Sequence, residues 1–349
     1  IKDSMFFMRF MMLKRFSFSF MVLVLAVAAA YTVFSVMPFP ICATAVNSKA
    51  NFTADMLPQE IGQSGENVES KPQTADVSSA VEAVSKGTVK GKISEEVLSP
   101  YKANLSYGKI FLKNSTGVAV NLKNELAAGV KFKIEQNGKP QVLIVSTHTS
   151  ECYMEQDRNY YTDQDKTGTY DQTKNVLCIG KIIKENLCAA GICALQSEAV
   201  HDKKFSGSYS ASAATVKEYL KKYPSIKVVI DVHRDSVNYD NGTKIKPTVK
   251  IDGKKAAQVM LVIGCEAGQV EGFPKWRENF RLAIRLQQQL ENDYPSLARS
   301  GTFTPRKYNQ HLTTGSLLIE MGTEANTLDE AKYSAQLLSN SLIKTLKNL

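Results

Sequence analysis

The feature that most constrains the fold is a repeated alternation of short apolar runs with longer amphipathic stretches, which begins near residue 105. Apolar runs of about four to eight residues are typical of buried strands, and apolar residues at helical spacing are typical of surface helices. Strands separated by such helices predict an α/β fold: a single domain with a mostly parallel central sheet flanked by helices. The expected strands lie within 141–147, 192–196, 226–233, 258–264 and 316–322, and the expected helices are 174–190, 210–223, 274–293 and 328–349.

The N-terminal part has the pattern of a membrane span. Residues 16–37 carry no charged side chain, and Arg9, Lys14 and Arg15 precede them. About 20 uncharged, mostly apolar residues suffice to cross a bilayer as a helix, and positive residues remain on the cytoplasmic side. We therefore expect a cell-membrane location, with a single N-terminal span and an extracytoplasmic catalytic domain. A cleaved signal is the alternative to a retained anchor.

The composition then divides the chain into three parts. Residues 1–45 are expected to form a cytoplasmic stub and the transmembrane anchor. Residues 46–104 are polar, rich in Ser, Gln, Glu and Lys, and nearly free of aromatic side chains until their last few positions, which predicts a flexible linker. Residues 105–349 are expected to form the catalytic domain.

The net charge of the chain is +9. Such a charge suits an anionic surface but does not identify one. The Lys and Arg residues are scattered rather than clustered, and no nucleic-acid-binding motif accompanies them. We therefore expect no nucleic-acid partner.

Titratable residues gather where three of the expected strands end. His148 and Glu151 follow the first strand, Asp231 and His233 end the third, and Glu320 lies in the last. In open α/β sheets the ligand crevice lies beyond the carboxyl ends of the strands, so these side chains are expected to converge. Asp231 could instead cap a turn or hold an imidazole tautomer from outside the metal shell.

Two imidazoles, one carboxylate and an open position for water are the ligand set of a catalytic zinc ion. A carboxylate that is not a ligand can accept the proton of the attacking water, and Glu320 is the candidate because a carboxylate in an apolar strand is costly unless it is used. Arg234 is a candidate catalytic residue that binds a substrate carboxylate or stabilises developing negative charge. Its alternative is a salt bridge to Asp235 or to another acid.

The remaining polar residues have weaker signals. His201 and His311 lie in polar, loop-like contexts and are expected to be surface residues. Residues 308–310, with the sequence YNQ, could line a substrate groove.

Several separated motifs resemble those of the stage II sporulation protein P family. They are THTSE, DVHRDS, FPKWRENFRLAIRLQ, YPSLARSG, YNQ and LLIEMGTEANTLDEA, and the resemblance extends from Tyr107 to the C-terminus. It implies a membrane-anchored peptidoglycan hydrolase that acts in engulfment during endospore formation. The implied activity is that of an N-acetylmuramoyl-L-alanine amidase that also cleaves peptide cross-links. The implied partners are the stage II sporulation proteins D, a lytic transglycosylase, and M, a membrane protein.

The domain is also distantly similar to zinc-dependent amidases of the amidase type 3 fold. That resemblance assigns His148 and His233 as zinc ligands and Glu320 as the catalytic carboxylate. The third ligand stays open: the position that matches the amidase pattern holds Asp171, whereas Glu151 belongs to the THTSE motif and is preferred. The prediction is a zinc-dependent peptidoglycan hydrolase. The alternative is a non-catalytic, wall-binding scaffold that recruits other wall hydrolases.

Overall fold

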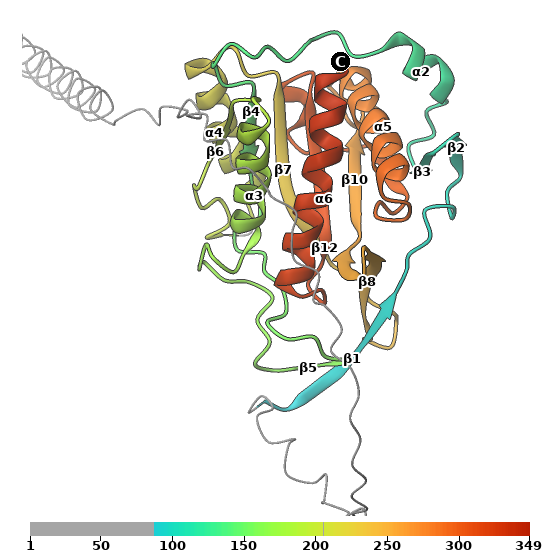
Figure 1. The fold of residues 1–349 in the computed structure, drawn as a ribbon, viewed down its shortest axis with the longest axis vertical. Coiled ribbons are helices and arrows are strands. Elements are labelled where there is room, and N and C mark those ends of the chain that lie inside the picture. Colours follow the sequence, from blue (N-terminus) through green and yellow to red (C-terminus); the bar gives the residue numbers. More distant parts are fainter. Residues whose placement is uncertain (1–86, 205) are drawn as a thin grey trace, which may run out of the picture. The chain divides into compact units, whose positions relative to one another are not determined.

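The computed structural model describes residues 87–204 and 206–349, which form an α/β fold (Figure 1). The strands are β1 (Val89–Glu96), β2 (Leu105–Tyr107), β3 (Ile110–Asn114), β4 (Val142–Val145), β5 (Tyr160–Thr162), β6 (Ala194–Gln196), β7 (Val228–Asp235), β8 (Lys244–Ile251), β9 (Lys254–Ala257), β10 (Val259–Gly264), β11 (Gly301–Thr304) and β12 (Ser316–Thr323). The helices are α2 (Leu122–Ala128), α3 (Val176–Ala189), α4 (Ser208–Lys222), α5 (Trp276–Asp293), α6 (Leu328–Lys347) and the short 3₁₀ helix η1 (Gln310–Leu312).

The strands form two sheets, and both sheets are mixed. The larger sheet has the order β2-β3-β11-β10-β12-β7-β4-β6, and the smaller one has the order β5-β1-β8-β9. In the larger sheet, β2 pairs antiparallel with β3 and β10 pairs antiparallel with β12, while the other pairs are parallel. The α/β class is confirmed, but the expected mostly parallel sheet is corrected to a mixed one.

A hairpin explains the reversal at β10. Parallel neighbours need a crossover connection, usually a helix, whereas a tight turn reverses the chain. Between β7 and β10 the chain forms the antiparallel hairpin β8–β9, so β10 enters the sheet in the direction opposite to β12. The turn holds Asp252 and Gly253 at positive φ values of 48° and 75°. Asp-Gly is a strong hairpin signal, so the sequence contained this information.

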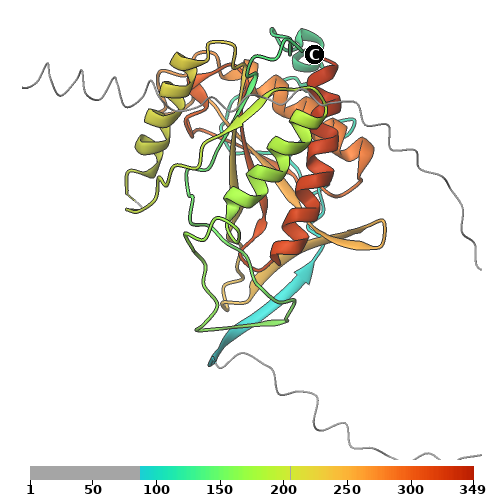
Figure 2. The same ribbon diagram turned by 60° about the vertical axis from the view of Figure 1, so that its left-hand side comes forward.

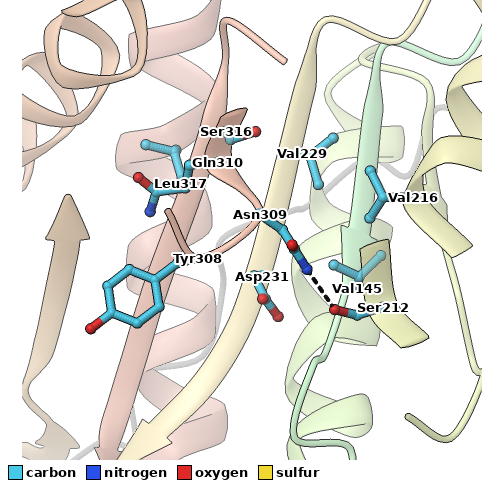
Figure 3. A pocket seen from close by; sticks show the side chains of 10 residues that line it. All are labelled: Val145, Ser212, Val216, Val229, Asp231, Tyr308, Asn309, Gln310, Ser316 and Leu317. Carbon is cyan, nitrogen blue, oxygen red and sulfur yellow. Dashed lines mark hydrogen bonds between the residues drawn. The ribbon is translucent and has the colours of Figure 1, made fainter. Parts of the chain in front are cut away.

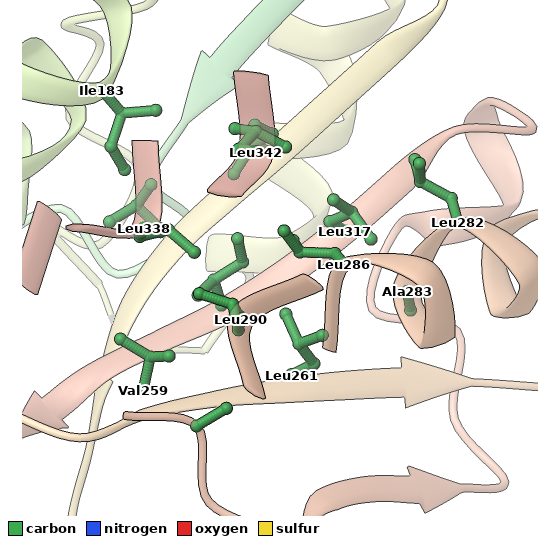
Figure 4. Close-up of a cluster of buried hydrophobic side chains, with 14 of the residues drawn as sticks. Ile183, Val259, Leu261, Leu282, Ala283, Leu286, Leu290, Leu317, Leu338 and Leu342 are labelled. Atoms are coloured by element: carbon green, nitrogen blue, oxygen red, sulfur yellow. The ribbon is translucent and has the colours of Figure 1, made fainter. Parts of the chain in front are cut away.

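Helices cover the two faces of the larger sheet unequally. Helices α3, α5 and α6 pack on one face and form the main core, part of which Figure 4 shows. Leu286 and Leu290 of α5 and Leu338 and Leu342 of α6 are completely buried there. Helix α4 packs on the opposite face against alternate residues of β4 and β7, and the second view shows this separation (Figure 2). Burying each such leucine contributes about 1.5–3 kcal/mol, so the apolar faces stabilise the layered arrangement.

The expected elements are confirmed with small shifts at their ends. All five expected strands and all four expected helices exist, as β4, β6, β7, β10 and β12 and as α3, α4, α5 and α6. Strands β5, β8, β9 and β11 and helix α2 were not expected. Strand β1 lies in the last part of the segment that we predicted as a linker, where it pairs with β5 and β8. Residues 46–86 of that segment lie outside the described residues.

The expected membrane location is corrected. Among residues 87–204 and 206–349, no helix combines the length and the apolar character that crossing a bilayer requires. The span that we expected at 16–37 lies outside the described residues.

Candidate active site

The candidate site lies where three adjacent strands end. Strands β12, β7 and β4 are parallel neighbours, which brings their carboxyl ends to one edge. Glu320 of β12 is the register partner of His233 of β7, and Asp231 of β7 is the partner of Val145 of β4. His148 follows β4 by three residues. The structure therefore brings together residues that are far apart in the sequence.

The two imidazole rings lie against each other. The ring centroids of His148 and His233 are 5.3 Å apart at an interplanar angle of 79°. Burial and the neighbouring His233 lower the pKa of His148. Burial alone would also lower the pKa of His233, but the carboxylates of Asp231 and Glu151 outweigh it and raise the pKa well above its usual value. The two imidazoles therefore lie in contrasting electrostatic environments.

Carboxylates flank both nitrogens of His233. Nδ1 lies 3.5 Å from Glu151 Oε2, and Nε2 lies 3.0 Å from Asp231 Oδ1. Asp231 is itself held by Thr147, whose backbone N–H and hydroxyl donate to its two oxygens over 2.8 and 2.6 Å. Glu151 and Asp231 therefore lie at opposite nitrogens of the ring, and Asp231, which Thr147 holds, is suited to orient it.

Asp171, the alternative third ligand, is placed differently. Its side chain is exposed and accepts hydrogen bonds from the backbone and hydroxyl of Thr173 over 3.0 and 2.7 Å. The geometry therefore favours Glu151 as the carboxylate that accompanies the imidazoles.

Glu320 lies beside His233 on the neighbouring strand. Its Oε2 atom is buried and has no hydrogen-bond partner within residues 87–204 and 206–349. Burial raises the pKa of Glu320 to about 8; the charge of His233 opposes this rise, and Asp235 and Glu151 add to it. A carboxyl group that titrates near neutral pH can both accept and return a proton.

Arg234 does not point into the site. Its Nε and Nη2 atoms donate to the backbone oxygens of Cys152 and Thr167 over 3.3 and 2.7 Å. Nη1 lies 3.7 Å from Glu324 Oε2, so the observed contact is the alternative of a salt bridge to an acid. Its backbone N–H donates to Glu151 Oε2 over 3.0 Å. The geometry does not support the expected catalytic role, because the guanidinium holds the loop around residues 152–167 instead.

Of the other two histidines, one differs from expectation. His201 is 7% exposed, and its ring nitrogens lie 2.8 Å from the oxygen of Ser146 and 2.9 Å from the hydroxyl of Thr215. The expectation that it is a surface residue is therefore wrong, whereas His311 is exposed as expected. Sequence context could not show this, because the partners of His201 come from distant segments.

Tyr209 of α4 is a residue of the site that the sequence did not indicate. Its ring centroid lies 5.6 Å from that of His148 and 6.5 Å from that of His233, nearly parallel to the latter at 16°. Tyr308 follows at 5.8 Å from Tyr209. Two tyrosines thus form an aromatic wall beside the imidazoles. Helical periodicity places Tyr209 on a helix but does not say that this helix end faces the site.

The donors fit zinc by type and largely by spacing. Ligand atoms about 2.0–2.2 Å from one tetrahedral zinc ion lie about 3.3–3.5 Å from each other. The 3.5 Å between His233 Nδ1 and Glu151 Oε2 matches this spacing. Two imidazoles on one ion have ring centroids about 5 Å apart, close to the 5.3 Å between His148 and His233.

An acidic cluster elsewhere offers a different set of donors. Within the described residues, only Glu95, Asp157 and Glu330 bring three such donor atoms within 4.8 Å of one another. The ammonium of Lys246 lies among them, 2.7 Å from Glu330 and 3.2 Å from Glu95, so a cation already neutralises this cluster. In the candidate site, by contrast, the donor atoms of His148, Glu151 and His233 do not all lie within 4.8 Å of one another. His148 therefore has to move closer to Glu151 and His233 before the three residues can hold one ion.

The fold and the site define an α/β protein with an imidazole–carboxylate centre at the carboxyl ends of adjacent strands. The family model for stage II sporulation protein P matches residues 44–343, and the chain belongs to this family. It is 30% identical over 210 residues to the stage II sporulation protein P of Bacillus subtilis (strain 168). The match covers 56% of this chain and 49% of that protein, so the chain spans about half of its relative's length.

Solved amidase structures are also similar to the chain. The CwlD amidase from Clostridioides difficile, in complex with the GerS lipoprotein, matches with a TM-score of 0.37 and 10% identity, over 60% of this chain and 97% of that chain. The N-acetylmuramoyl-L-alanine amidase AmiC2 of Nostoc punctiforme matches with a TM-score of 0.33 and 13% identity, over 59% and 94%. Because these TM-scores and identities are low, no residue role is transferred from the solved amidases to this chain.

Proposed function

We propose that the protein is a zinc-dependent peptidoglycan hydrolase that acts in engulfment during endospore formation. Its reaction is hydrolysis of the amide bond between N-acetylmuramic acid and L-alanine, with endopeptidase activity on peptide cross-links. Membership of the stage II sporulation protein P family supports the sporulation and cell-wall role. Stage II sporulation proteins D and M are the partners that this role suggests.

The observation that carries the proposal is the buried, unpartnered Oε2 of Glu320 beside the imidazole pair. A buried carboxylate without a partner is costly, and such groups concentrate at sites where a proton is transferred. Within the described residues, no Lys, Arg or His side chain forms an ion pair with Glu320. Its carboxylate is therefore free to exchange a proton with a substrate or a water molecule.

In this proposal His148, Glu151 and His233 hold the zinc ion. Bound zinc supplies a Lewis acid that polarises the scissile carbonyl and makes a water molecule more acidic. The carboxylate of Asp231 lies 3.0 Å from Nε2 of His233, which favours a proton on Nε2 and leaves Nδ1 as the donor atom. The backbone N–H of Arg234 holds Glu151 in place.

Glu320 transfers the proton. Its carboxylate accepts a proton from the attacking water and then returns it to the leaving amine of L-alanine. The neighbouring Asp235 and Glu151 favour the protonated form of Glu320 after the first transfer, since they raise its pKa. One group therefore serves as base and then as acid.

The test is digestion of purified peptidoglycan by the full chain, with and without a chelator, followed by product masses. We expect muramic acid ends freed from their stem peptides, and loss of product when the chelator is present. Glu320→Gln should lower the rate by about 100-fold or more. Glu218→Gln, an exposed change on α4, is the matched control and should leave the rate unchanged.

Other product patterns would contradict the proposal. Cleaved cross-links without freed muramic acid ends would indicate a peptidase, and deacetylated sugars would indicate a deacetylase. Wall binding without any digestion, unaffected by Glu320→Gln, would indicate the scaffold alternative.

A further inference from the structure

The loop that ends in Tyr308 and Asn309 has an unusual backbone. These consecutive residues have φ values of 46° and 56°, and neither is glycine. Side chains other than Gly, Asn and Asp rarely adopt this left-handed region, and a tyrosine there is uncommon. Such strain persists only where surrounding contacts enforce it, and it concentrates at functional sites.

The contacts that enforce it come from Asn309 and Gln310. Asn309 Nδ2 donates to the backbone oxygen of Tyr209 over 2.8 Å. It also donates to the hydroxyl of Ser212 over 2.9 Å, the contact drawn in Figure 3. Gln310, which is buried, accepts from the N–H of Gly264 over 2.8 Å and donates to the oxygen of Val262 over 2.7 Å. The loop is thereby tied to both α4 and β10.

The loop approaches β10 at Gly264 more closely than a side chain would allow. A Cβ atom at this glycine would lie 2.2 Å from the backbone oxygen of Arg306. The glycine is therefore needed for this packing. The glycine at position 264 and the hydrogen bonds of Asn309 and Gln310 together hold the loop in one conformation.

The same contacts connect the loop to the candidate active site. The hydroxyl of Ser212 lies 2.7 Å from that of Thr147, which lies 2.6 Å from Asp231 Oδ2. Asp231 in turn lies 3.0 Å from His233 Nε2. A continuous series of polar contacts thus connects Asn309 with the imidazole of His233.

Tyr308 of this loop lies beside Tyr209 of the candidate site. Its ring is 5.8 Å from Tyr209, which packs on both imidazoles, and its side chain is partly exposed. Within residues 87–204 and 206–349, the Tyr308 hydroxyl makes no hydrogen bond. Burial raises the pKa of Tyr308 and Glu320 adds to this rise, while Arg306 and His233 oppose it without reversing it, so the phenol remains a neutral hydrogen-bond donor.

We propose that the Tyr308 hydroxyl donates a hydrogen bond to the oxygen of the scissile amide of the peptidoglycan substrate, and that Asn309 positions Tyr308 for this contact. The proposal rests on the proposed function, because it assumes an amide bond between the imidazoles and Glu320. A preorganised donor aimed at developing negative charge accelerates acyl transfer, typically by about 100-fold or more. A tyrosine that served packing alone would need neither a strained backbone nor an available hydroxyl.

The test compares steady-state kinetics of full-length variants on a soluble muropeptide prepared from purified peptidoglycan. Tyr308→Phe keeps the ring and removes the hydroxyl; we expect kcat to fall about 100-fold while KM changes less than about threefold. Asn309→Gly tolerates the positive φ but loses the amide that bonds Tyr209 and Ser212; we expect kcat to fall about 10-fold. Tyr219→Phe, elsewhere on α4, should match the wild type. Thermal unfolding of each variant verifies that it folds.

The outcomes separate this inference from the function on which it rests. If the wild type is active and Glu320→Gln is not, but Tyr308→Phe keeps its kcat within about twofold, the inference is wrong and the function stands. A rise in KM with unchanged kcat also overturns it, because the hydroxyl would then contact a remote part of the substrate. If Tyr308→Phe does not fold, the kcat of Asn309→Gly decides. An inactive wild type removes both proposals.

Discussion

His233 Nε2 lies 3.0 Å from Asp231 Oδ1, and the two residues are two positions apart on β7. Side chains at alternate positions of a strand share a face, so both point to the same side of the sheet. The carboxylate is buried and fixed by Thr147, and the imidazole ring is thereby fixed as well. Orientation of the ring is decided before any ligand binds.

Asp231→Asn should weaken the site without removing its shape. The amide can still accept from Thr147, but it lacks the charge that raises the pKa of His233. We expect the pKa of His233 in the metal-free chain to fall, measured by NMR titration of the ring, and wall digestion to slow about 10- to 100-fold. Asp240→Asn, an exposed change, is the control. An unchanged titration would refute the assigned role.

Glu320 should make the stability of the metal-free chain depend on pH. Its pKa is raised from 4.5 to about 8, so the folded chain holds a proton that the unfolded chain releases between these values. Stability is therefore fully present below about pH 4.5 and declines as pH rises through about 8. Glu320→Gln cannot ionise, and we expect it to be more stable than the wild type by about 5 kcal/mol near pH 9.

Urea unfolding in the presence of a chelator measures this difference at several pH values. Glu218→Gln should retain the wild-type slope of stability against pH. Equal slopes for wild type and Glu320→Gln would show that the carboxyl of Glu320 titrates normally.

The third metal ligand can be identified by metal content. Glu151→Ala should lose bound zinc, because Glu151 lies 3.5 Å from His233 Nδ1. Asp171→Ala should retain it, because the carboxylate of Asp171 is bonded to Thr173 and exposed. Elemental analysis of zinc per chain after gel filtration measures both, with His148→Ala as the reference for an emptied site. The opposite pattern would transfer the ligand role to Asp171.

Lys246 should be a structural residue rather than part of a metal site. Its side chain is 1% exposed and pairs with Glu330, Asp157 and Glu95 over 2.7, 2.5 and 3.2 Å. Removing one partner of a buried ion pair typically costs about 3–5 kcal/mol, so we expect Lys246→Ala to lower the free energy of unfolding by that amount. Lys255, whose side chain is 34% exposed, is the comparison, and Lys255→Ala should cost less than about 1 kcal/mol. Urea unfolding compares the two, and equal losses would contradict the distinction.

The candidate site was partly predictable because local sequence carries part of its geometry. His148, His233 and Glu320 each end or interrupt an apolar run, which marks them as polar groups near buried strands. The period of two along β7 also separates Arg234 from His233, since neighbouring residues point to opposite faces. The sequence analysis nevertheless offered Arg234 as a candidate catalytic residue, whereas in the structure its guanidinium contacts the backbone oxygens of Cys152 and Thr167. Tyr209 had no such signal, since nothing local shows which helix end meets the imidazoles.

The amino-acid sequence by itself determined five strands of the larger sheet, the four longer helices and the residues at the strand ends, because apolar periodicity and chain punctuation are local properties. Only the tertiary structure decided that β12, β7 and β4 are neighbours, which sets Glu320 beside His233. It also decided that Glu151 lies beside His233, that the side chain of Asp171 is exposed, and that His201 is buried. Strand pairing and burial depend on contacts between distant segments, and such contacts are chosen by the packing of the whole core rather than by any short stretch of the chain.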